Sequence, residues 1–263
     1  MEALLNTVAP VGLIVALGHL LGKRQAIDLT ALSRLALYLF VPALIFDSMR
    51  KAGLSLDAAW GLVLGFVLTY ALLFIPSLLL SRLLGLKAPL RKTQLAGVLF
   101  PNSGNLGLSL SFSALGTEGL ERAVVYFVAS SAFMFSLGPA LFRGGGKEGL
   151  LLTLRLPLVW TLMGGLLLRG FPFRLDEGVH LLGQAAIPVL LTALGLQLAQ
   201  TRLVLGGFEL LVSTLRLLLT PLLAHGVGAL LGFGHAHGGQ CLLMSQAFGG
   251  DAARAARSAV ATT

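Results

Sequence analysis

Long apolar runs separated by short polar segments dominate the chain. Nine runs approach the roughly 20 residues that a helix needs to cross the hydrocarbon core of a membrane, although the last is incomplete: 4–22, 28–48, 59–81, 93–115, 122–142, 150–168, 178–199, 206–232 and 238–248 onward. They are continuously apolar and do not alternate as the strands of a membrane barrel do. Because only helices or closed barrels satisfy their backbone in lipid, the pattern predicts membrane-spanning helices.

Composition places the chain in the same class. Of its 263 residues, 56% are hydrophobic and 11% are charged, and the mean hydropathy is +0.88, values well outside those of soluble proteins. We therefore predict an all-α polytopic membrane protein. The sparse charge excludes a disordered chain and a nucleic-acid binder, and the single cysteine, Cys241, excludes a disulfide-stapled secreted domain.

The formal net charge of +8 is explained by topology, because cytoplasmic loops of membrane proteins collect Lys and Arg. If the first connection is cytoplasmic, eleven Lys and Arg residues fall on that side and five on the other. We therefore expect a multi-pass protein of the cell (inner) membrane with an external N-terminus. The first run should be a retained span, since Glu2 precedes it and Lys23 and Arg24 follow it, unlike a secretory signal.

Prolines inside the apolar runs indicate an internal repeat. Three pairs match in order at offsets of 147, 146 and 145 residues: Pro10 with Pro157, Pro42 with Pro188, and Pro76 with Pro221. Chance alignment of apolar sequence is the alternative, but three ordered pairs favour duplication. A unit of five spans makes the second copy inverted, which is a transporter architecture. We expect a first five-helix repeat at 1–143, a cytoplasmic linker at 144–149, and a second repeat of about four helices at 150–263.

The fourth run contains the segment PNSGNLG, which begins at Pro101. Pro101 lacks a backbone N–H, and Gly104 and Gly107 permit unwound backbone. Asn102 and Asn105 are two of the three asparagines in the chain, and their amides can both donate and accept hydrogen bonds. Unwound backbone at membrane depth is tolerated only where it faces protein or a water-filled cavity. The segment therefore predicts a broken helix inside the membrane.

Two interpretations of this break stay open. In the first, Asn102, Ser103, Gly104, Asn105 and Gly107 form a substrate site, and the amino end of the half-helix that begins near Gly104 suits a carboxylate. In the second, the helix is only kinked, and the asparagines satisfy its backbone or join it to neighbouring helices. We favour the site, because the repeat places a broken helix here.

The sequence resembles the auxin efflux carrier family of membrane transporters, whose members include plant auxin exporters and bacterial carriers of malonate or other organic anions. The stretches that carry the resemblance are FVPALIF (40–46), LFPNSGNLGLSL (99–110), LPLVWTLMGGLLLRG (156–170), AAIPVLLTALGLQL (185–198) and LRLLLTPLL (215–223). The resemblance implies two inverted five-helix repeats whose fourth and ninth helices cross as broken helices, similar to bile-acid symporters and sodium/proton antiporters. It places Asn102 and Asn105 in the crossover motif of the first repeat.

The second repeat departs from the family pattern. The repeat offset pairs the first break with SQAFGG at 245–250, which has no proline. Gln246, Gly249 and Gly250 then supply the opposing half of the site, or this stretch is the loop before a final helix. The arginines that follow, at 254 and 257, would be costly inside a half-helix in the bilayer, which favours the loop. We therefore expect an incomplete second repeat that lacks the tenth helix.

Polar residues elsewhere in the runs give further candidates. Arg216 lies inside the eighth run, where it either contacts an anionic substrate or pairs with Glu209 seven residues earlier. Asp47 could carry a proton, although its neighbours Arg50 and Lys51 favour a solvated ion pair. Gln184, four residues before a proline, lines the cavity or, as we favour, relieves the kink.

We expect a secondary transporter of small organic anions, of auxin-like or malonate-like carboxylates, that works by alternating access. The alternative is a truncated, non-transporting remnant or scaffold. An enzyme is not expected, because the sequence holds no metal-binding spacing, nucleophile elbow or phosphate loop. No cofactor or metal is expected. The expected partners are the anion, the lipid bilayer and, as one candidate, a second copy in a homodimer, but no nucleic acid.

Overall fold

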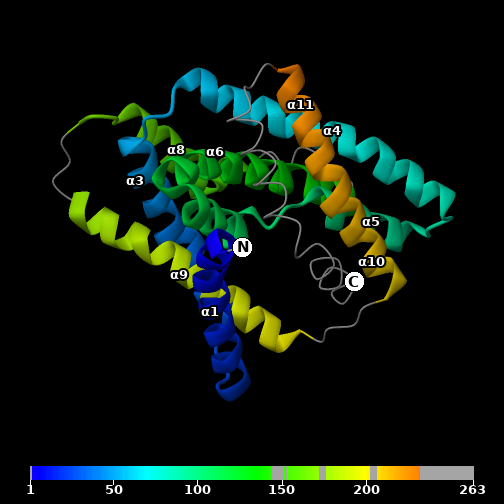
Figure 1. Cartoon of the computed structure of the whole chain (residues 1–263), viewed down its shortest axis with the longest axis horizontal. Helices are drawn as coiled ribbons and strands as arrows, with labels where there is room; N and C mark the ends of the chain where they lie inside the picture. Colours follow the sequence, from blue (N-terminus) through cyan, green and yellow to red (C-terminus); the bar gives the residue numbers. More distant parts are fainter. Residues whose placement is uncertain (1, 144–150, 152, 172–175, 202–205, 232–263) are drawn as a thin grey trace. The chain divides into compact units, whose positions relative to one another are not determined.

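The computed structural model describes residues 2–143, 151, 153–171, 176–201 and 206–231, and every regular element in these ranges is a helix (Figure 1). The elements are α1 (Glu2–Arg24), α2 (Leu29–Leu35), η1 (Ala36–Phe40), α3 (Val41–Lys51), α4 (Leu56–Leu83), α5 (Ala88–Leu99), η2 (Ser103–Gly107), α6 (Leu108–Arg143), α8 (Pro157–Leu167), α9 (Asp176–Gln200), α10 (Gly207–Thr214), η3 (Leu215–Leu219) and α11 (Thr220–Leu230). The three η elements are single π-helical turns.

The first eight predicted runs fall on these helices, and the run at 238–248 lies outside the described residues. Among the described residues, five segments are long and apolar enough to cross a membrane: Leu29–Lys51, Leu56–Leu83, Ala88–Gly138, Asp176–Gln200 and Gly207–Leu230. The prediction of an all-α polytopic membrane protein is therefore confirmed. The inverted relation of the repeats and their boundaries at 1–143, 144–149 and 150–263 stay predictions.

Helix α6 combines the end of the fourth predicted run with the whole of the fifth. Its backbone leaves the helical region at Gly116, where φ is +64°. A side chain rarely adopts this left-handed conformation, so glycine permits the bend. The two runs are thus separated by a turn at one glycine.

Among the described residues, two of the three π-helical turns end two residues before a proline. Turn η1 ends at Phe40, α3 begins at Val41, and Pro42 is the second residue of α3. In the same way η3 is followed by Thr220, and Pro221 is the second residue of α11. A proline ring clashes with the carbonyl four residues earlier and cannot donate a hydrogen bond. A wider turn before the proline relieves both problems while the helix continues.

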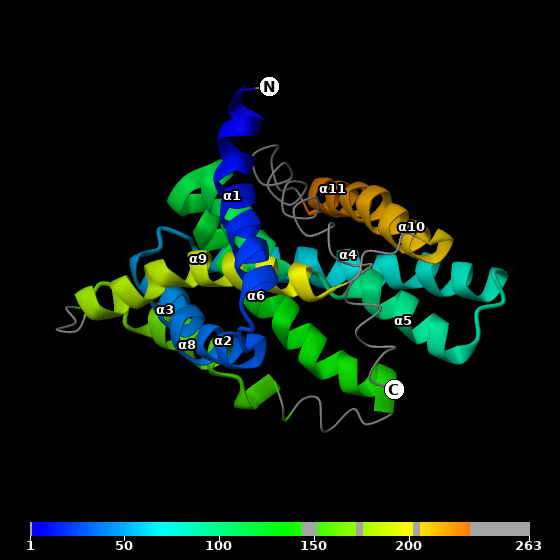
Figure 2. The same ribbon diagram turned by 90° about the horizontal axis from the view of Figure 1, so that it is seen from below.

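The chain divides into two compact units, each assembled from three separate stretches. Unit 1 comprises Met1–Ser55, Gly104–Val128 and Leu154–Leu203, and unit 2 comprises Leu56–Ser103, Ala129–Thr153 and Val204–Thr263. In unit 1, α9 packs along α1 and α3, and α3 also packs against α8 (Figures 1 and 2). In unit 2, α4 packs against α5 and α11. Neither unit is a continuous piece of sequence.

Glycines allow α1 and α9 in unit 1 to approach closely. A Cβ atom on Gly195 would lie 2.2 Å from the carbonyl oxygen of Val15, and one on Gly18 would lie 2.6 Å from that of Thr192. Both obstacles are backbone atoms, which cannot rotate away as a side chain does. Small residues that let helix backbones approach are a common way of packing helices in membranes.

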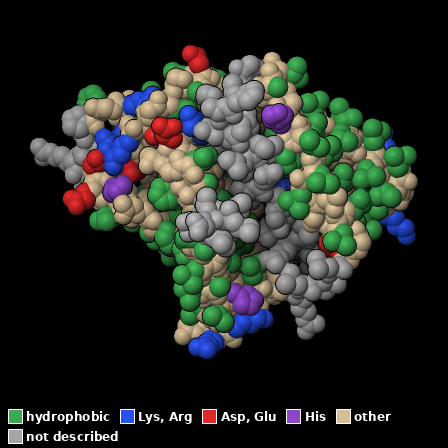
Figure 3. Space-filling view, viewed as in Figure 1, with side chains coloured by type: hydrophobic (Ala, Val, Ile, Leu, Met, Phe, Trp, Pro, Cys, Tyr) green, Lys and Arg blue, Asp and Glu red, His purple; other side chains and the backbone are tan. Residues whose placement is uncertain are grey.

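The core of unit 2 contains a group of aromatic rings. Phe133 of α6 meets Phe66 and Tyr70 of α4, with ring centroids 5.5 and 6.1 Å away, and it meets Phe100 at 6.3 Å. These distances are within the range of favourable aromatic packing. Many other large apolar side chains are exposed, among them Trp60 at 71% and Leu222 at 68%, and Figure 3 shows how widely hydrophobic side chains cover the visible face. Such a surface suits contact with lipid.

Candidate functional site

The fourth predicted span is interrupted in the structure where the sequence places its break. Helix α5 ends at Leu99, and Phe100 adopts an extended conformation with φ −101° and ψ 102°. Pro101 and Asn102 lie outside any helix, and the π-helical turn η2 begins at Ser103. Between α5 and η2, the backbone therefore has groups that a continuous helix would have satisfied.

Pro101 explains which backbone group loses its partner. In a continuous helix, the carbonyl of Gly97 would accept from the N–H four residues later, at position 101, where proline has none. The guanidinium of Arg216 takes this place: its Nη1 donates to the carbonyl oxygen of Gly97 at 2.7 Å and to that of Phe100 at 2.9 Å. A cation thus caps the carboxyl end of α5, the end at which a helix dipole favours positive charge.

Arg216 belongs to η3 and is only 1% exposed. Its Nε and Nη2 atoms are buried without a hydrogen-bond partner among the described residues. The expected alternative, a pair with Glu209, is not what holds it, because the Glu209 carboxylate accepts from the backbone N–H of Gly206 at 3.0 Å and Arg216 donates to carbonyls. A buried charge with unused donors is costly unless something else binds them.

The other predicted residues of the break occupy varied environments. Ser103 is buried, and its hydroxyl lies 2.6 Å from that of Ser130. Gly104 faces the ring of Phe127, which would be 3.0 Å from an added Cβ. Asn102 and Asn105 are half-buried.

Within η2 and the start of α6, the carbonyl oxygen of Asn105 accepts a hydrogen bond from the Ser109 hydroxyl at 2.8 Å. Gly107, the last residue of η2, is buried. The serine and glycine contacts show how the break is held, and they leave the role of the asparagine amides as a prediction. Gln246, Gly249 and Gly250, the predicted opposing half of the site, lie outside the described residues.

A second polar cluster lies in unit 1, and sequence reasoning did not find it. Asp47 of α3 is 8% exposed, and its carboxylate lies 2.7 Å from His180 Nδ1 and 2.7 Å from Lys51 Nζ. The expected ion pair is present between Asp47 and Lys51, but the expectation that it is solvated is wrong for the carboxylate, which is buried against α9. Gln184, expected to relieve the kink of a proline, instead contacts His180 Nε2 through its amide at 2.7 Å.

More charged groups extend this cluster towards the beginning of α9. Arg50 pairs with Asp176 and also donates from Nη1 to the carbonyl oxygen of Phe171 at 3.0 Å. Lys51 Nζ lies 3.9 Å from the same Asp176 carboxylate. Figure 3 shows acidic, basic and histidine side chains gathered at this end of unit 1. Only the neighbours of Asp47 within α3 were visible as a pattern in the sequence.

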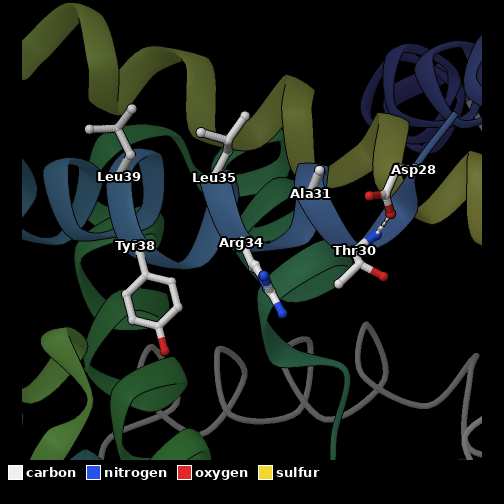
Figure 4. Close-up of a pocket in the computed structure, with 7 residues that line it drawn as sticks. All are labelled: Asp28, Thr30, Ala31, Arg34, Leu35, Tyr38 and Leu39. Atoms are coloured by element: carbon white, nitrogen blue, oxygen red, sulfur yellow. Dashed lines mark hydrogen bonds between the residues drawn. The ribbon is translucent and has the colours of Figure 1, made fainter.

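A surface groove runs along the outer side of α2 and η1 (Figure 4). Its lining side chains extend from opposite sides of the ribbon, with Ala31, Leu35 and Leu39 on one side and Thr30, Arg34 and Tyr38 on the other. Asp28 closes one end, where its carboxylate accepts from the backbone N–H of Thr30 at 2.8 Å as the N-cap of α2. These contacts have a structural explanation in helix capping, and we assign no site to the groove.

Comparison with known proteins gives a consistent result. Residues 3–155 match the family described as membrane transport protein. An uncharacterized transporter from Methanothermobacter thermautotrophicus (strain Delta H) is 31% identical over 239 residues, which cover 87% of this chain and 79% of that protein. Both matches indicate a transporter and not an enzyme. The chain therefore belongs to the membrane transport protein family, the auxin efflux carrier family that its motifs indicated.

Proposed function

We propose that the chain is a secondary transporter of small organic anions, auxin-like or malonate-like carboxylates, across the cell (inner) membrane by alternating access. The observation that carries this proposal is the buried guanidinium of Arg216 beside the break, with Nε and Nη2 unused among the described residues. An arginine keeps its charge in any protein environment. A site built around it favours an anion over a neutral or cationic solute.

The geometry of the guanidinium favours a carboxylate in particular. Nη1 is held by the carbonyls of Gly97 and Phe100, which orients the planar group. The remaining donors, Nε and Nη2, form one edge of the guanidinium fork, and such an edge binds the two oxygens of a carboxylate with parallel hydrogen bonds. A bound carboxylate would supply the partners that these two atoms lack.

The break itself would supply further contacts to the substrate. Asn102, Ser103, Gly104, Asn105 and Gly107 lie in the stretch that follows the capped end of α5. The amino end of the segment that starts at Ser103 carries backbone N–H groups and the positive end of a helix dipole. Amide side chains can then bind a hydroxyl, a ring nitrogen or a second carboxylate of the substrate.

Two further parts of the proposal concern the chain as a whole. The opposing half of the site would come from Gln246, Gly249 and Gly250, and the external N-terminus follows from the distribution of Lys and Arg between alternate loops. Alternating access then exposes the site to each side of the membrane in turn.

Uptake by the purified protein in proteoliposomes tests the proposal. We expect saturable uptake and counterflow of labelled malonate, indole-3-acetate or citrate, with no uptake of the matched neutral amides. Protein-free liposomes give the background, and excess unlabelled carboxylate should compete while the amides should not. Equal transport of acid and amide, or no carboxylate counterflow in folded protein, would contradict an anion site.

Replacement of an asparagine in the break tests its part in the site. We expect Asn105→Leu to lower carboxylate uptake by about tenfold or more, because a hydrogen bond to a charged group contributes roughly 1.5–3 kcal/mol. The measurement is the initial rate as a function of substrate concentration. Gln200→Leu makes a similar change of polarity at the exposed end of α9 and should leave uptake unchanged. Normal uptake by Asn105→Leu would remove this residue from the site.

A further inference from the structure

The charged cluster of unit 1 holds a carboxylate and an imidazole in direct contact inside the helix pair. Asp47 of α3 and His180 of α9 are 133 positions apart in sequence, and the Asp47 Oδ2 and His180 Nδ1 atoms lie 2.7 Å apart. The Asp47 side chain is 11% exposed, whereas that of His180 is 43% exposed. The imidazole therefore connects a buried carboxylate with the outside of the helix pair.

The contacts of His180 fit both of its charge states. A neutral ring can donate from Nδ1 to Asp47 and accept at Nε2 from the Gln184 amide nitrogen, which lies 2.7 Å away. A protonated ring donates from both nitrogens. Rotation of the Gln184 amide by half a turn then presents its oxygen to Nε2, so that both ring nitrogens keep an acceptor. Both ring nitrogens of His180 can thus stay hydrogen-bonded in either charge state.

The charges around the pair would accommodate this change. Lys51 Nζ lies 2.7 Å from Asp47 Oδ1, and Asp176 balances Arg50 at the beginning of α9. With these four charged and His180 neutral, the cluster has no net charge, and one bound proton makes it singly positive. Glu177, adjacent to Asp176 in sequence, is exposed. Proton binding therefore changes the cluster by one unit of charge.

Among the described residues, the other elements packed on α3 and α9 bring no further titratable side chain into an ion pair or hydrogen bond with Asp47 or His180. Elements α8 and η1 contain none apart from Tyr38, which is exposed. The loop after α3 holds Arg169 on the carbonyls of Ala52 and Leu54 and Glu121 on the N–H of Gly53. Helix α1, which carries His19, Lys23 and Arg24, packs further along α9, around Thr192 and Gly195. Helix α2, which also packs on α9, carries Arg34, and this side chain is exposed.

The pair sits where two proline-containing helices touch. Gly183 of α9 approaches the backbone of α3 so closely that an added Cβ would lie 3.1 Å from the Cα atom of Leu44. Asp47 lies about one turn from Leu44 in α3, and His180 lies about one turn from Gly183 in α9. Pro42 and Pro188 interrupt the hydrogen bonding of the same two helices. A change of charge at this contact acts on two helices whose hydrogen bonding is already interrupted by proline.

We propose that the Asp47–His180 pair binds one proton in each transport cycle and carries it in the same direction as the organic anion. This inference rests on the proposed function. Imidazole can take up and release a proton, and an ionisable pair in segments long enough to span a membrane is a candidate for an ion pathway. Movement of a proton with the anion neutralises its charge, which reduces the work of crossing the membrane potential.

Accumulation driven by a pH gradient tests the proposal in proteoliposomes that contain the full chain. With the membrane potential clamped by valinomycin and potassium, one proton per monovalent anion predicts about tenfold accumulation on the alkaline side per pH unit. Under the same gradient, we expect liposomes with His180→Gln or Asp47→Asn to reach about equal substrate concentrations inside and outside. Both variants keep a hydrogen-bonding group and remove the titrating one. His225→Gln, a change at an exposed histidine of α11, should behave as the unaltered protein does.

Counterflow at equal pH separates this proposal from the proposed function. Exchange of labelled for unlabelled carboxylate needs no net proton movement, so both variants should retain it. Absence of counterflow in the unaltered protein contradicts the transporter proposal itself. Counterflow without accumulation under a gradient in the unaltered protein, or accumulation that persists in both variants, overturns the proton site. If a variant also loses counterflow, Gln184→Leu is measured in its place. This change leaves the Asp47–His180 pair intact, and we expect it to lower the accumulation that the pH gradient drives.

Discussion

Replacement of Arg216 by leucine is expected to abolish carboxylate transport and to lower the stability of the protein. The leucine removes the only charge in η3 and leaves the carbonyls of Gly97 and Phe100 without their donor. A buried polar group without a partner costs about 1–3 kcal/mol. Loss of a desolvated bidentate ion pair costs about 2–5 kcal/mol of affinity, so transport should fall by roughly two orders of magnitude or more.

Two further substitutions separate the cap of α5 from the binding of an anion. Arg216→Gln can still donate to one carbonyl but carries no charge, so we expect thermal stability to recover in part while carboxylate uptake stays low. Arg216→Lys keeps the charge without the planar fork, so we expect weak uptake with a raised KM. Uptake with ordinary affinity by folded Arg216→Gln would show that the arginine only caps the helix.

The control for this series is an exposed arginine. Arg155 is exposed, and Arg155→Leu makes the same chemical change away from the break. Uptake and melting temperature should both stay close to those of the unaltered protein. A loss of uptake in Arg155→Leu as large as in Arg216→Leu would mean that net charge alone, and not the buried position, explains the effect.

Addition of one methyl group at Gly195 is expected to disrupt the packing of α1 on α9. In Gly195→Ala, the new Cβ atom would lie 2.2 Å from the Val15 carbonyl oxygen and 2.7 Å from the His19 backbone nitrogen. The helices must separate, because both obstacles are backbone. Overpacking of this kind costs about 1–3 kcal/mol, and we expect the melting temperature in detergent to fall by on the order of 5 °C or more.

The matched control is another glycine of the same helix. Gly178 has no atom within 4 Å of an added Cβ, so Gly178→Ala should leave the melting temperature unchanged or raise it slightly, since alanine is the better helix former. The measurement is the fraction of monodisperse protein after heating. Equal melting temperatures for the two variants would contradict the close approach of α1 and α9.

The helices and the break could be predicted from sequence because their causes are local. Apolar length identifies a span, and Pro101 lacks its own N–H whatever surrounds it. The partner of the freed Gly97 carbonyl could not be found in this way, because Arg216 lies 119 positions away. Glu209, seven residues from Arg216 and opposite in charge, was the nearer candidate in sequence. The choice between them depends on how helices pack.

The same reasoning explains why the second polar cluster was missed. The sequence shows Asp47 beside Arg50 and Lys51, and this pattern alone is typical of an exposed ion pair. Burial by α9 and the contact with His180, 133 positions away, reverse that interpretation. The π-helical turns before Pro42 and Pro221 also escaped notice, since proline indicates a disturbed helix but not the form of the disturbance.

The pairing of α1 with α9 also has a consequence for biogenesis. Helix α1 ends at Arg24, and α9 begins only at Asp176. At about 5–20 residues per second, a ribosome completes the beginning of α9 roughly 8 to 30 seconds after the end of α1. During this interval the glycine surface of α1 lacks the helix that covers it in the folded chain. Helix α1 must therefore wait in the bilayer for a partner from a much later part of the chain.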